Sequence, residues 1–460
     1  ILFDMNNRPS IPKGTRDFNS IQLYKRNYII DIIKDNFLKF GFNPIETPSF
    51  EKSSTLLGKY GDEGDRLIFK ILKSGDFLKD LDNQDLVASN KGKIASKISD
   101  KALRYDLTVP FARYVVQNQN EITLPFKRFQ IQPVWRADKP QRGRFREFLQ
   151  CDADVIGSQS LYQEIELIRL FDSIFDSLKL SGTRIKINNR KILVGLSEIL
   201  DCKDKFKDLT TALDKKDKIG IESFDQELES KGFSKKSINT IIKLINFSGD
   251  FKKYMTLLKS TFKNSLTGLE GVSDLEFIYS TIEDLGLKSC SLNFDLSLAR
   301  GIDYYTGVIF EVSAPNTVSI GSIAGGGRYD NLTEIFGLSN LSGIGISFGL
   351  DRIYMVLDEL DLFPALQSNI VKVLFLNFGK ENSLFSLEAI SKLRENNIST
   401  ELYPDSLSLK KQLGYANKNN IPYAVFVGDD ELSKKRYSLK DMNSGSQELL
   451  TLTQLIKKLS

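Results

Sequence analysis

The sequence contains no histidine among its 460 residues. This absence excludes a Ser-His-Asp triad, a Cys-His pair, a histidine general base and every metal site that depends on an imidazole ligand. Chemistry in this chain must therefore use arginine, lysine, carboxylates, hydroxyl groups, the backbone or a bound ion. We accordingly expect no metal ion held by histidine or cysteine.

Cysteine is also scarce, and long apolar segments are missing. Cys151, Cys202 and Cys290 are far apart, odd in number and without a CxxC pair, which is typical of thiols in a reducing cytosol rather than of a disulfide framework. No apolar run approaches the roughly 18–20 residues that a membrane span needs. The first residues also lack the basic and apolar regions of a signal peptide. We therefore expect a cytoplasmic protein without membrane contact.

The length and the composition predict a globular protein of about two to four domains. Residues 1–190 and 290–365 are interpreted as two parts of one core, because apolar strands and helices recur in both. The lysine-rich, helical pattern of residues 191–289 indicates an inserted helical domain. Beyond Phe363, strands and helices alternate, which is typical of a compact α/β domain at 368–460.

Within the core, apolar residues recur at helical spacing over residues 20–40 and 159–180. Gly41 is expected to cap the first of these helices. The strand that follows contains Pro48, which favours an edge or an interface. The apolar runs between about 103 and 158 are interpreted as strands around a charged loop.

Asp106 and Thr108 are the first candidate pair of functional residues. They lie two residues apart in a segment that we interpret as a strand, so their side chains are expected on one face. Together they would offer an anion and a hydroxyl group to a cationic or donor-rich ligand. Taken alone, such a pair is more often a surface strand with an acidic turn residue.

A basic hairpin is expected between two apolar strands at residues 136–146. Guanidinium groups bind phosphate oxygens through two parallel hydrogen bonds, so this hairpin suits a polyphosphate. A solvated charged loop is the alternative, but Arg136 follows directly on the apolar run that ends at Trp135. The basic residues of the hairpin are Arg136, Lys139, Arg142, Arg144 and Arg146.

Further polar residues follow the hairpin. Gln150, Asp152 and Asp154 alternate along the returning strand and should share one of its faces. Arg300 stands between apolar strands and is followed by Tyr304 and Tyr305, an arrangement that suits the floor of a pocket. The two tyrosines point opposite ways if the chain is extended, so at most one needs to face a ligand. A core tyrosine is an equally good interpretation of either.

Two more segments favour the binding of a ligand. The glycines at 325–327 are interpreted as a loop whose backbone can approach a ligand closely. A glycine-rich loop alone is weak evidence, and this one fits neither the P-loop nor the Rossmann pattern. Arg352 is expected to open a helix at the end of a strand, where the helix N-terminus already favours anions. Pairing of Arg352 with Asp351 or Asp358 is the alternative.

Together these segments resemble the histidyl-tRNA synthetases, a family of class II aminoacyl-tRNA synthetases, over nearly the whole chain. The helix at 20–40 with its following strand resembles motif 1, the dimer-interface signature of the family. Residues 126–157 resemble motif 2 and residues 343–353 motif 3. LARGIDYYTG (298–307) and AGGGRYDNL (324–332) resemble the segments that distinguish histidine enzymes from other class II members. The resemblance implies an α+β fold, with an antiparallel sheet flanked by helices, a helical insertion and a C-terminal α/β anticodon-binding domain.

The resemblance also implies roles in binding ATP. Arg136 would hold the α-phosphate and Arg352 the γ-phosphate. Arg300 would contact the α-phosphate together with the histidine carboxylate, which makes these three arginines the expected catalytic residues. Asp138 and Arg144 would complete the ATP site. Mg²⁺ would enter bound to the ATP phosphates.

The resemblance implies that histidine is bound by carboxylates, an amide, a hydroxyl group, an arginine and a tyrosine. Asp106 and Thr108 would bind the α-amino group, while Gln150 and Asp154 would help to fix the amino group and the imidazole. One of the two tyrosines would lie on the ring. The expected histidine-binding residues are Asp106, Thr108, Gln150, Asp154, Arg300, Tyr304 and Tyr305.

The implied partners are histidine, ATP and the histidine tRNA, whose acceptor end would approach Gln141 and Arg142, and the implied assembly is a homodimer. The implied reaction forms histidyl-adenylate and pyrophosphate, then transfers histidine to the 3′ end of the tRNA. The alternatives are an inactive paralogue that regulates ATP phosphoribosyltransferase, a sensor of uncharged tRNA, and another class II synthetase. The first lacks an anticodon domain, which residues 371–460 would supply. The segments at 298–307 and 324–332 argue against the last.

Overall fold

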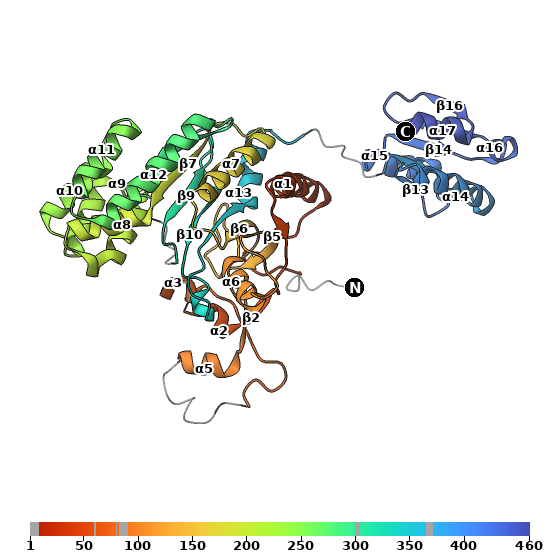
Figure 1. Ribbon diagram of the computed structural model, residues 1–460. Helices are drawn as coiled ribbons and strands as arrows, with labels where there is room; N and C mark the ends of the chain where they lie inside the picture. The colour runs from red at the N-terminus through yellow and green to blue at the C-terminus, as the bar shows by residue number, and fades with distance from the viewer. Residues whose placement is uncertain (1–8, 59–60, 80, 82–90, 300–303, 365–370) are drawn as a thin grey trace. The chain divides into compact units, whose positions relative to one another are not determined.

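The computed structural model describes residues 9–58, 61–79, 81, 91–299, 304–364 and 371–460. The chain divides into two compact units, Ile1–Phe363 and Pro364–Ser460, whose elements are labelled in Figure 1. Within the described ranges, no helix is long and apolar enough to cross a membrane.

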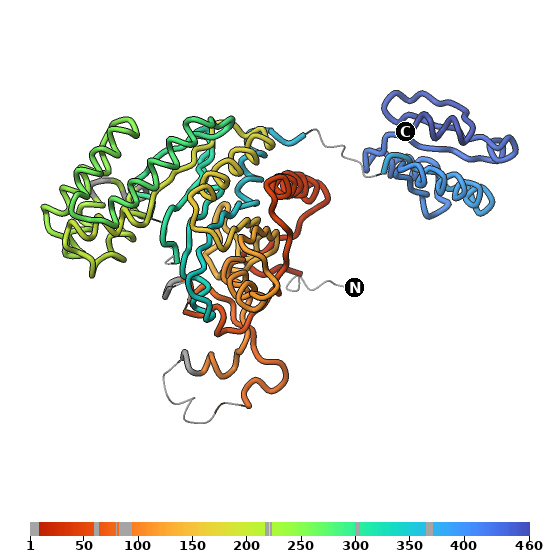
Figure 2. The backbone as a smooth tube through the Cα atoms, viewed as in Figure 1, coloured from red at the N-terminus to blue at the C-terminus, as the bar shows by residue number. Residues whose placement is uncertain are grey.

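The first unit is built on an eight-stranded sheet. Its strand order is β1-β5-β6-β11-β10-β9-β7-β8, so β6 and β11 lie side by side although they are far apart in the sequence (Figure 2). Neighbouring strands are antiparallel except at the two edges, where β1 pairs with β5 and β7 with β8 in parallel. The strands are β1 (Asn43–Pro44), β5 (Phe126–Trp135), β6 (Glu147–Ile156), β11 (Gly343–Gly349), β10 (Ala324–Tyr329), β9 (Val308–Ser313), β7 (Thr183–Asn189) and β8 (Cys290–Phe294).

Three helices cover one face of this sheet: α1 (Ser20–Lys39), α7 (Tyr162–Ser177) and α13 (Leu350–Glu359). The first two confirm the helices expected from apolar spacing. A capping box opens α1, in which Asn19 accepts a hydrogen bond from the backbone N–H of Gln22. The core under these helices is aromatic: the Phe348 ring lies 5.9 Å from that of Phe37 and 5.3 Å from that of Phe171.

Residues 190–285 form a group of helices that extends this core. Helices α8 and α12 pack closely, since a Cβ added at Gly195 would lie 2.5 Å from the Cα of Gly268. One continuous apolar cluster runs from the sheet into these helices, and α12 also contacts α7 and β7. The division of this unit into a two-part core and an inserted domain stays a prediction. The elements are α8 (Arg190–Ile199), a 3₁₀ turn (Lys203–Lys205), α9 (Phe206–Ser230), α10 (Lys235–Ile245), α11 (Phe251–Thr261) and α12 (Leu266–Leu285).

A small three-stranded sheet, in the order β2-β4-β3, lies between α1 and β5 in the sequence. The single strand expected after Gly41 is divided into β1 and β2, and Pro48 stands in the interruption between them. The interpretation of residues 103–158 as strands is wrong for 108–117, which form helix α6. The elements are β2 (Phe50–Lys52), α2 (Ser53–Leu56), α3 (Gly61–Arg66), β3 (Lys70–Ile71), α5 (Lys91–Ile98), β4 (Lys101–Leu103) and α6 (Thr108–Gln117).

The second unit has a five-stranded sheet in the order β13-β12-β14-β15-β16, with its own apolar core. The first three strands are parallel, and β15 and β16 continue as an antiparallel hairpin. The expected alternation of strands and helices is thus confirmed. The elements are β12 (Val373–Phe375), α14 (Lys380–Glu395), β13 (Thr400–Leu402), α15 (Leu409–Lys418), β14 (Tyr423–Phe426), α16 (Asp429–Lys434), β15 (Tyr437–Asp441), β16 (Gln447–Leu450) and α17 (Leu452–Leu459).

Candidate active site

A pocket of about 460 Å³ lies against the centre of the large sheet. Strand alternation separates it from the apolar core: Cys151 and Ala153 of β6 belong to the core cluster, whereas Gln150, Asp152 and Asp154 line the pocket. The expectation that these three polar residues share one strand face is therefore confirmed. β10 and β11 complete the floor beside β6.

Asp154 is a buried carboxylate of the pocket that is held by two partners. The buried Arg128 places Nη2 2.8 Å from its Oδ2, and the hydroxyl of Tyr329 donates to Oδ1 at 2.6 Å. Burial raises the pKa of Asp154, while the charge of Arg128 and the hydrogen bond from Tyr329 oppose that rise. Burial likewise raises the pKa of Tyr329 well above its usual value, so this hydroxyl stays a donor.

Space for that carboxylate comes from a glycine on the neighbouring strand. Gly345 is opposite Asp154 in the pairing of β11 with β6, and a Cβ at Gly345 would lie 1.9 Å from Asp154 Oδ1. Gly326 on β10 is equally constrained, because its Cβ would lie 2.0 Å from the carbonyl oxygen of Gly345. The interpretation of 325–327 as a loop is wrong, since these residues are the buried middle of strand β10.

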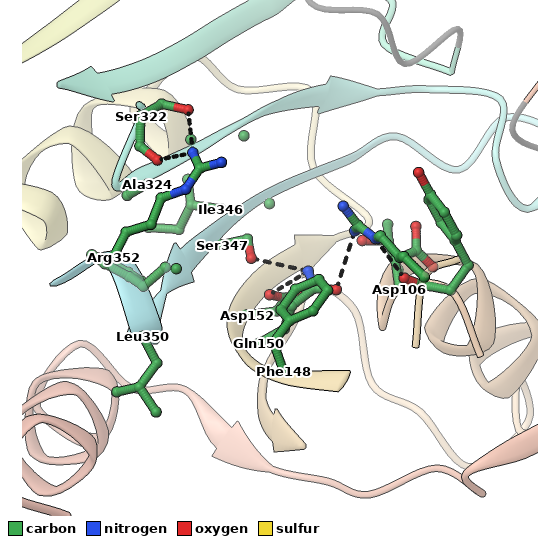
Figure 3. A pocket seen from close by; sticks show the side chains of 18 of the residues that line it. Asp106, Phe148, Gln150, Asp152, Ser322, Ala324, Ile346, Ser347, Leu350 and Arg352 are labelled. Carbon is green, nitrogen blue, oxygen red and sulfur yellow. Dashed lines mark hydrogen bonds between the residues drawn. The ribbon is translucent and has the colours of Figure 1, made fainter. Parts of the chain in front are cut away.

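Gln150 and Asp152 form a polar cluster with Ser347 of β11, drawn in Figure 3. The Gln150 side-chain Nε2 lies 3.1 Å from Ser347 Oγ and 3.3 Å from Asp152 Oδ1. Burial raises the pKa of Asp152 to about 7, with Asp154 adding to the rise and Arg128 opposing it. The carboxyl group therefore changes charge near neutral pH.

Arg136 enters the pocket at the start of the hairpin loop between β5 and β6. Its guanidinium lies 4.3 Å from the centre of the Tyr105 ring and 5.2 Å from that of Phe148, and Nε donates to the Tyr105 carbonyl at 3.0 Å. Nη2 donates to Gln150 Oε1 at 3.4 Å. Stacking and hydrogen bonds therefore hold this cation against the β6 face.

The rest of the hairpin divides into two groups. Asp138 and Arg144 line the pocket. Gln141 and Arg142 do not belong to its lining, and Arg142 is an exposed side chain whose Nη2 lies 2.6 Å from Glu359 Oε2. The loop is closed by a bridge between Gln141 and Arg144.

Arg352 is on the first turn of α13, which confirms the expected strand–helix junction after β11. Its Nη1 donates to the Ser322 carbonyl at 2.6 Å (Figure 3), and its Nε donates to the Gly143 carbonyl at 3.2 Å. The neighbouring Asp351 accepts hydrogen bonds from Arg16, at 2.7 Å, and from Arg26 of α1. Helix α13 is thereby tied to the N-terminal segment.

Asp106 and Thr108 both line the pocket, but for a different reason from the one expected. They belong to the start of α6 and not to a strand. The Asp106 carboxylate accepts a hydrogen bond from the backbone N–H of Val109 at 3.1 Å, which satisfies a donor of the first helical turn. Thr108 is the first residue of that helix.

Tyr304 and Tyr305 also both line the pocket, with their ring centres 4.9 Å apart. The expectation that at most one of them needs to face a ligand came from an extended chain, and the lining of the pocket includes both. Arg300 lies outside the described residues. Arg128 and Tyr329 are the site residues that the sequence interpretation missed. Tyr329 belongs to the recognised GGGRYD segment, whereas nothing in the local sequence marks Arg128.

No group of three or more Cys, Asp or Glu side chains that could hold a metal ion is found among the residues described. The pocket instead combines arginines from the hairpin loop and α13 with carboxylates from β6 and the start of α6. Such a site suits a ligand that carries phosphate at one end and cationic or N–H groups at the other.

Comparison with known proteins agrees with this chemistry. The family model "Histidyl-tRNA synthetase" matches residues 97–353 and the model "Anticodon binding domain" matches 371–460. A histidine–tRNA ligase of Christiangramia forsetii is 57% identical over 451 residues, covering 98% of this chain and 99% of the relative. One of Flavobacterium johnsoniae is 54% identical over 473 residues, covering 99% and 100%.

A solved structure of a histidyl-tRNA synthetase has a similar fold. The crystal structure of histidyl-tRNA synthetase from Nostoc sp. PCC 7120 matches with a TM-score of 0.79 at 28% identity, covering 98% of this chain and 99% of that one. The antiparallel sheet, the hairpin and helix-start arginines and the separate α/β unit define an aminoacyl-tRNA synthetase of class II. Within that class, the chain belongs to the histidyl-tRNA synthetase family.

Proposed function

We propose that this chain ligates histidine to its tRNA in two steps, through histidyl-adenylate. The observation that carries the proposal is the presence of arginines and carboxylates in one pocket. Arg136 and Arg352 line it and suit phosphate, and Asp106 and Asp154 line it and suit an amino acid with N–H groups. Relatives named histidine–tRNA ligase over their full length support the same reaction.

In the first step, the histidine carboxylate attacks the α-phosphorus of ATP and pyrophosphate leaves. The nucleophile is already an anion, so no protein base is required. The protein must hold two anions together and stabilise charge on the α-phosphoryl group. Arg136 and Arg300 would contact that group, and Arg352 would hold the γ-phosphate. Mg²⁺ arrives with the ATP phosphates as part of the substrate and offsets their charge.

The remaining residues of the ATP part have supporting roles. Asp138 and Arg144 line the pocket beside Arg136, and we assign them to the nucleotide. The aromatic rings of Tyr105 and Phe148 keep the Arg136 guanidinium in place without neutralising it. An arginine held in this way needs little rearrangement when the phosphate binds.

The histidine part uses hydrogen-bond pairing. Asp106, Thr108 and Gln150 would bind the α-amino group, and Asp154 with Tyr304 or Tyr305 would bind the imidazole. A site built to hydrogen-bond a substrate N–H rejects analogues that lack it by about 10⁴–10⁵ in favourable cases. Selection against other amino acids then follows from binding, without a separate editing site.

In the second step, the terminal ribose hydroxyl of the tRNA attacks the mixed anhydride. A phosphate oxygen of the adenylate would accept the hydroxyl proton, since no histidine is available. Gln141 and Arg142 would meet the acceptor end, and residues 371–460 would bind the anticodon. We further propose that the enzyme is a cytoplasmic homodimer.

A pyrophosphate-exchange assay across the amino acids tests this function. Exchange that depends on histidine, followed by histidine transfer to tRNA, is the expected result. Tight tRNA binding without any exchange would indicate a sensor, and exchange with a different amino acid would indicate another synthetase. Absence of both activities, with stimulation of ATP phosphoribosyltransferase, would indicate the regulatory paralogue.

A further inference from the structure

The side-chain amide of Gln150 lies between a cation and a carboxylate. On one side Arg136 Nη2 donates to Oε1 at 3.4 Å. On the other, Nε2 lies 3.3 and 3.4 Å from the two oxygens of Asp152 and 3.1 Å from Ser347 Oγ. Figure 3 shows these contacts around the labelled Gln150, Asp152 and Ser347.

This arrangement determines which way the amide points. An arginine can only donate hydrogen bonds, and an ionised carboxylate can only accept them. When Asp152 is ionised, Gln150 therefore satisfies both neighbours in a single orientation, with Oε1 toward Arg136 and Nε2 toward Asp152. In that orientation Oε1 is offered to a donor in the pocket, such as the α-amino group of an amino acid.

The position of Asp152 in the sheet favours its contact with Gln150. It is opposite Ser347 in the pairing of β6 with β11, and it is 2% exposed. Ser347 hydrogen-bonds to the Asp152 carboxylate, so the three side chains satisfy one another. The charged groups that face Asp152 are Arg128 on β5, Asp154 on β6 and Asp106 before α6.

We propose that Asp152 is a positioning residue of the histidine site, which acts by holding the Gln150 amide in its acceptor orientation. The inference rests on the proposed function and deepens it, because it assigns a carboxylate that has no role in the mechanism above. A direct contact of Asp152 with histidine is not part of it.

The energetic balance supports a functional reason for Asp152. Its carboxylate is buried, and two of its three charged neighbours carry the same charge. A buried carboxylate lowers stability when it ionises unless attraction to a cation offsets the cost, and here the attraction of Arg128 is opposed by two like charges. Burial also raises its pKa to about 7. Ionisation of Asp152 is therefore unfavourable for folding, which supports a role in what the residue positions.

The test compares Asp152→Ala, Gln150→Ala and the double variant in histidine-dependent pyrophosphate exchange. Asp152→Ala should raise the KM for histidine about five- to tenfold, the size of one lost hydrogen bond. In the Gln150→Ala background the same substitution should change the KM by less than about twofold, because the group that it positions is already gone. Asp152→Asn keeps an acceptor oxygen and should restore most of the affinity.

Asp172 on α7 provides the matched control. It is another buried aspartate, and its carboxylate accepts the backbone N–H groups of Lys288, Ser289 and Cys290 at 2.8–2.9 Å. Asp172→Ala should lower the melting temperature and leave the KM for histidine unchanged. Asp152→Ala should do the opposite, with an unchanged or higher melting temperature and a raised KM.

Equal effects of Asp152→Ala in the presence and absence of Gln150 would overturn the proposal, and so would an unchanged KM for histidine. Either result would leave the proposed function intact as long as the wild-type chain shows histidine-dependent exchange. If the wild-type chain shows no such exchange, the proposed function itself has failed.

Discussion

The hydroxyl of Tyr329 on β10 donates to the carboxylate of Asp154 on β6 at 2.6 Å, across the intervening strand β11. The two residues are separated by 175 positions in the sequence. This bond and the charge of Arg128 are what oppose the effect of burial on the pKa of Asp154.

Removing that hydroxyl should weaken histidine binding and change its pH dependence. In Tyr329→Phe the pKa of Asp154 rises further, because one group that stabilises the ionised form is lost. The acidic limb of kcat/KM in pyrophosphate exchange should then move to higher pH, and activity at the plateau should fall about tenfold. A pH profile that coincides with that of the wild type would show that this bond does not control Asp154.

Arg300 is predicted from the sequence to contact the α-phosphate and the histidine carboxylate. Arg300→Ala should lower pyrophosphate exchange by about 10²–10³-fold or more, because a donor to the developing charge is lost. The melting temperature should stay nearly unchanged. Near-normal exchange in this variant would refute the role.

The space around Gly345 gives a prediction for stability and activity together. In Gly345→Ala the new Cβ would lie 1.9 Å from Asp154 Oδ1, so the strand or the carboxylate has to move. We expect a loss of about 1–3 kcal/mol in the free energy of unfolding, together with loss of histidine-dependent exchange.

Gly414 is the matched control for that substitution. It lies inside helix α15, and a Cβ there would meet nothing within 4 Å. Gly414→Ala should stabilise the second unit by about 0.5–1 kcal/mol, since alanine is the better helix former. Urea unfolding measures both effects, and equal losses in the two variants would contradict the steric explanation.

Asp152 should make stability depend on pH. Its pKa is about 7 in the folded chain, well above the ordinary aspartate value of 3.8 that we take for the unfolded chain. Between these values the folded state binds more protons than the unfolded state, so this group lowers stability as pH rises. The gain in stability from Asp152→Asn should therefore be small near pH 4 and grow up to pH 8. A gain in the free energy of unfolding of the same size at pH 4 and pH 8, measured by urea unfolding, would contradict the raised pKa of Asp152.

The absence of histidine from all 460 residues suggests a regulatory consequence. An enzyme that charges the histidine tRNA, but contains no histidine, can be translated when that charged tRNA is scarce. Synthesis of the wild type should persist during histidine starvation, whereas a variant with histidine at exposed sites such as Lys252 and Lys253 should be made less. Equal yields would favour compositional drift as the explanation.

The local sequence predicted those helices and strands whose own residue pattern is enough to indicate them. Helices α1 and α7 follow from apolar spacing, and the β5–β6 hairpin follows from two apolar runs around a basic loop. Gln150, Asp152 and Asp154 were assigned to one face because strand geometry alone decides it.

The failures have physical reasons as well. Residues 325–327 have no side chains that could indicate a strand, and only the neighbouring strands make them one. In α6, the apolar run favoured a strand interpretation, but the carboxylate of Asp106 accepts the backbone N–H of Val109 in the first helical turn. The partners of Asp154 were missed because they approach it only in the folded sheet.

The apolar cluster that runs from the large sheet into α8–α12 has a mechanical consequence. Helix α12 contacts both α7 and β7, and α8 follows directly on β7. A force applied to this helical group would be transmitted to the sheet through packed side chains, because no flexible linker separates α8 from β7. For the same reason, a shortened chain without residues 190–285 would expose apolar surface of α7 and β7 to water.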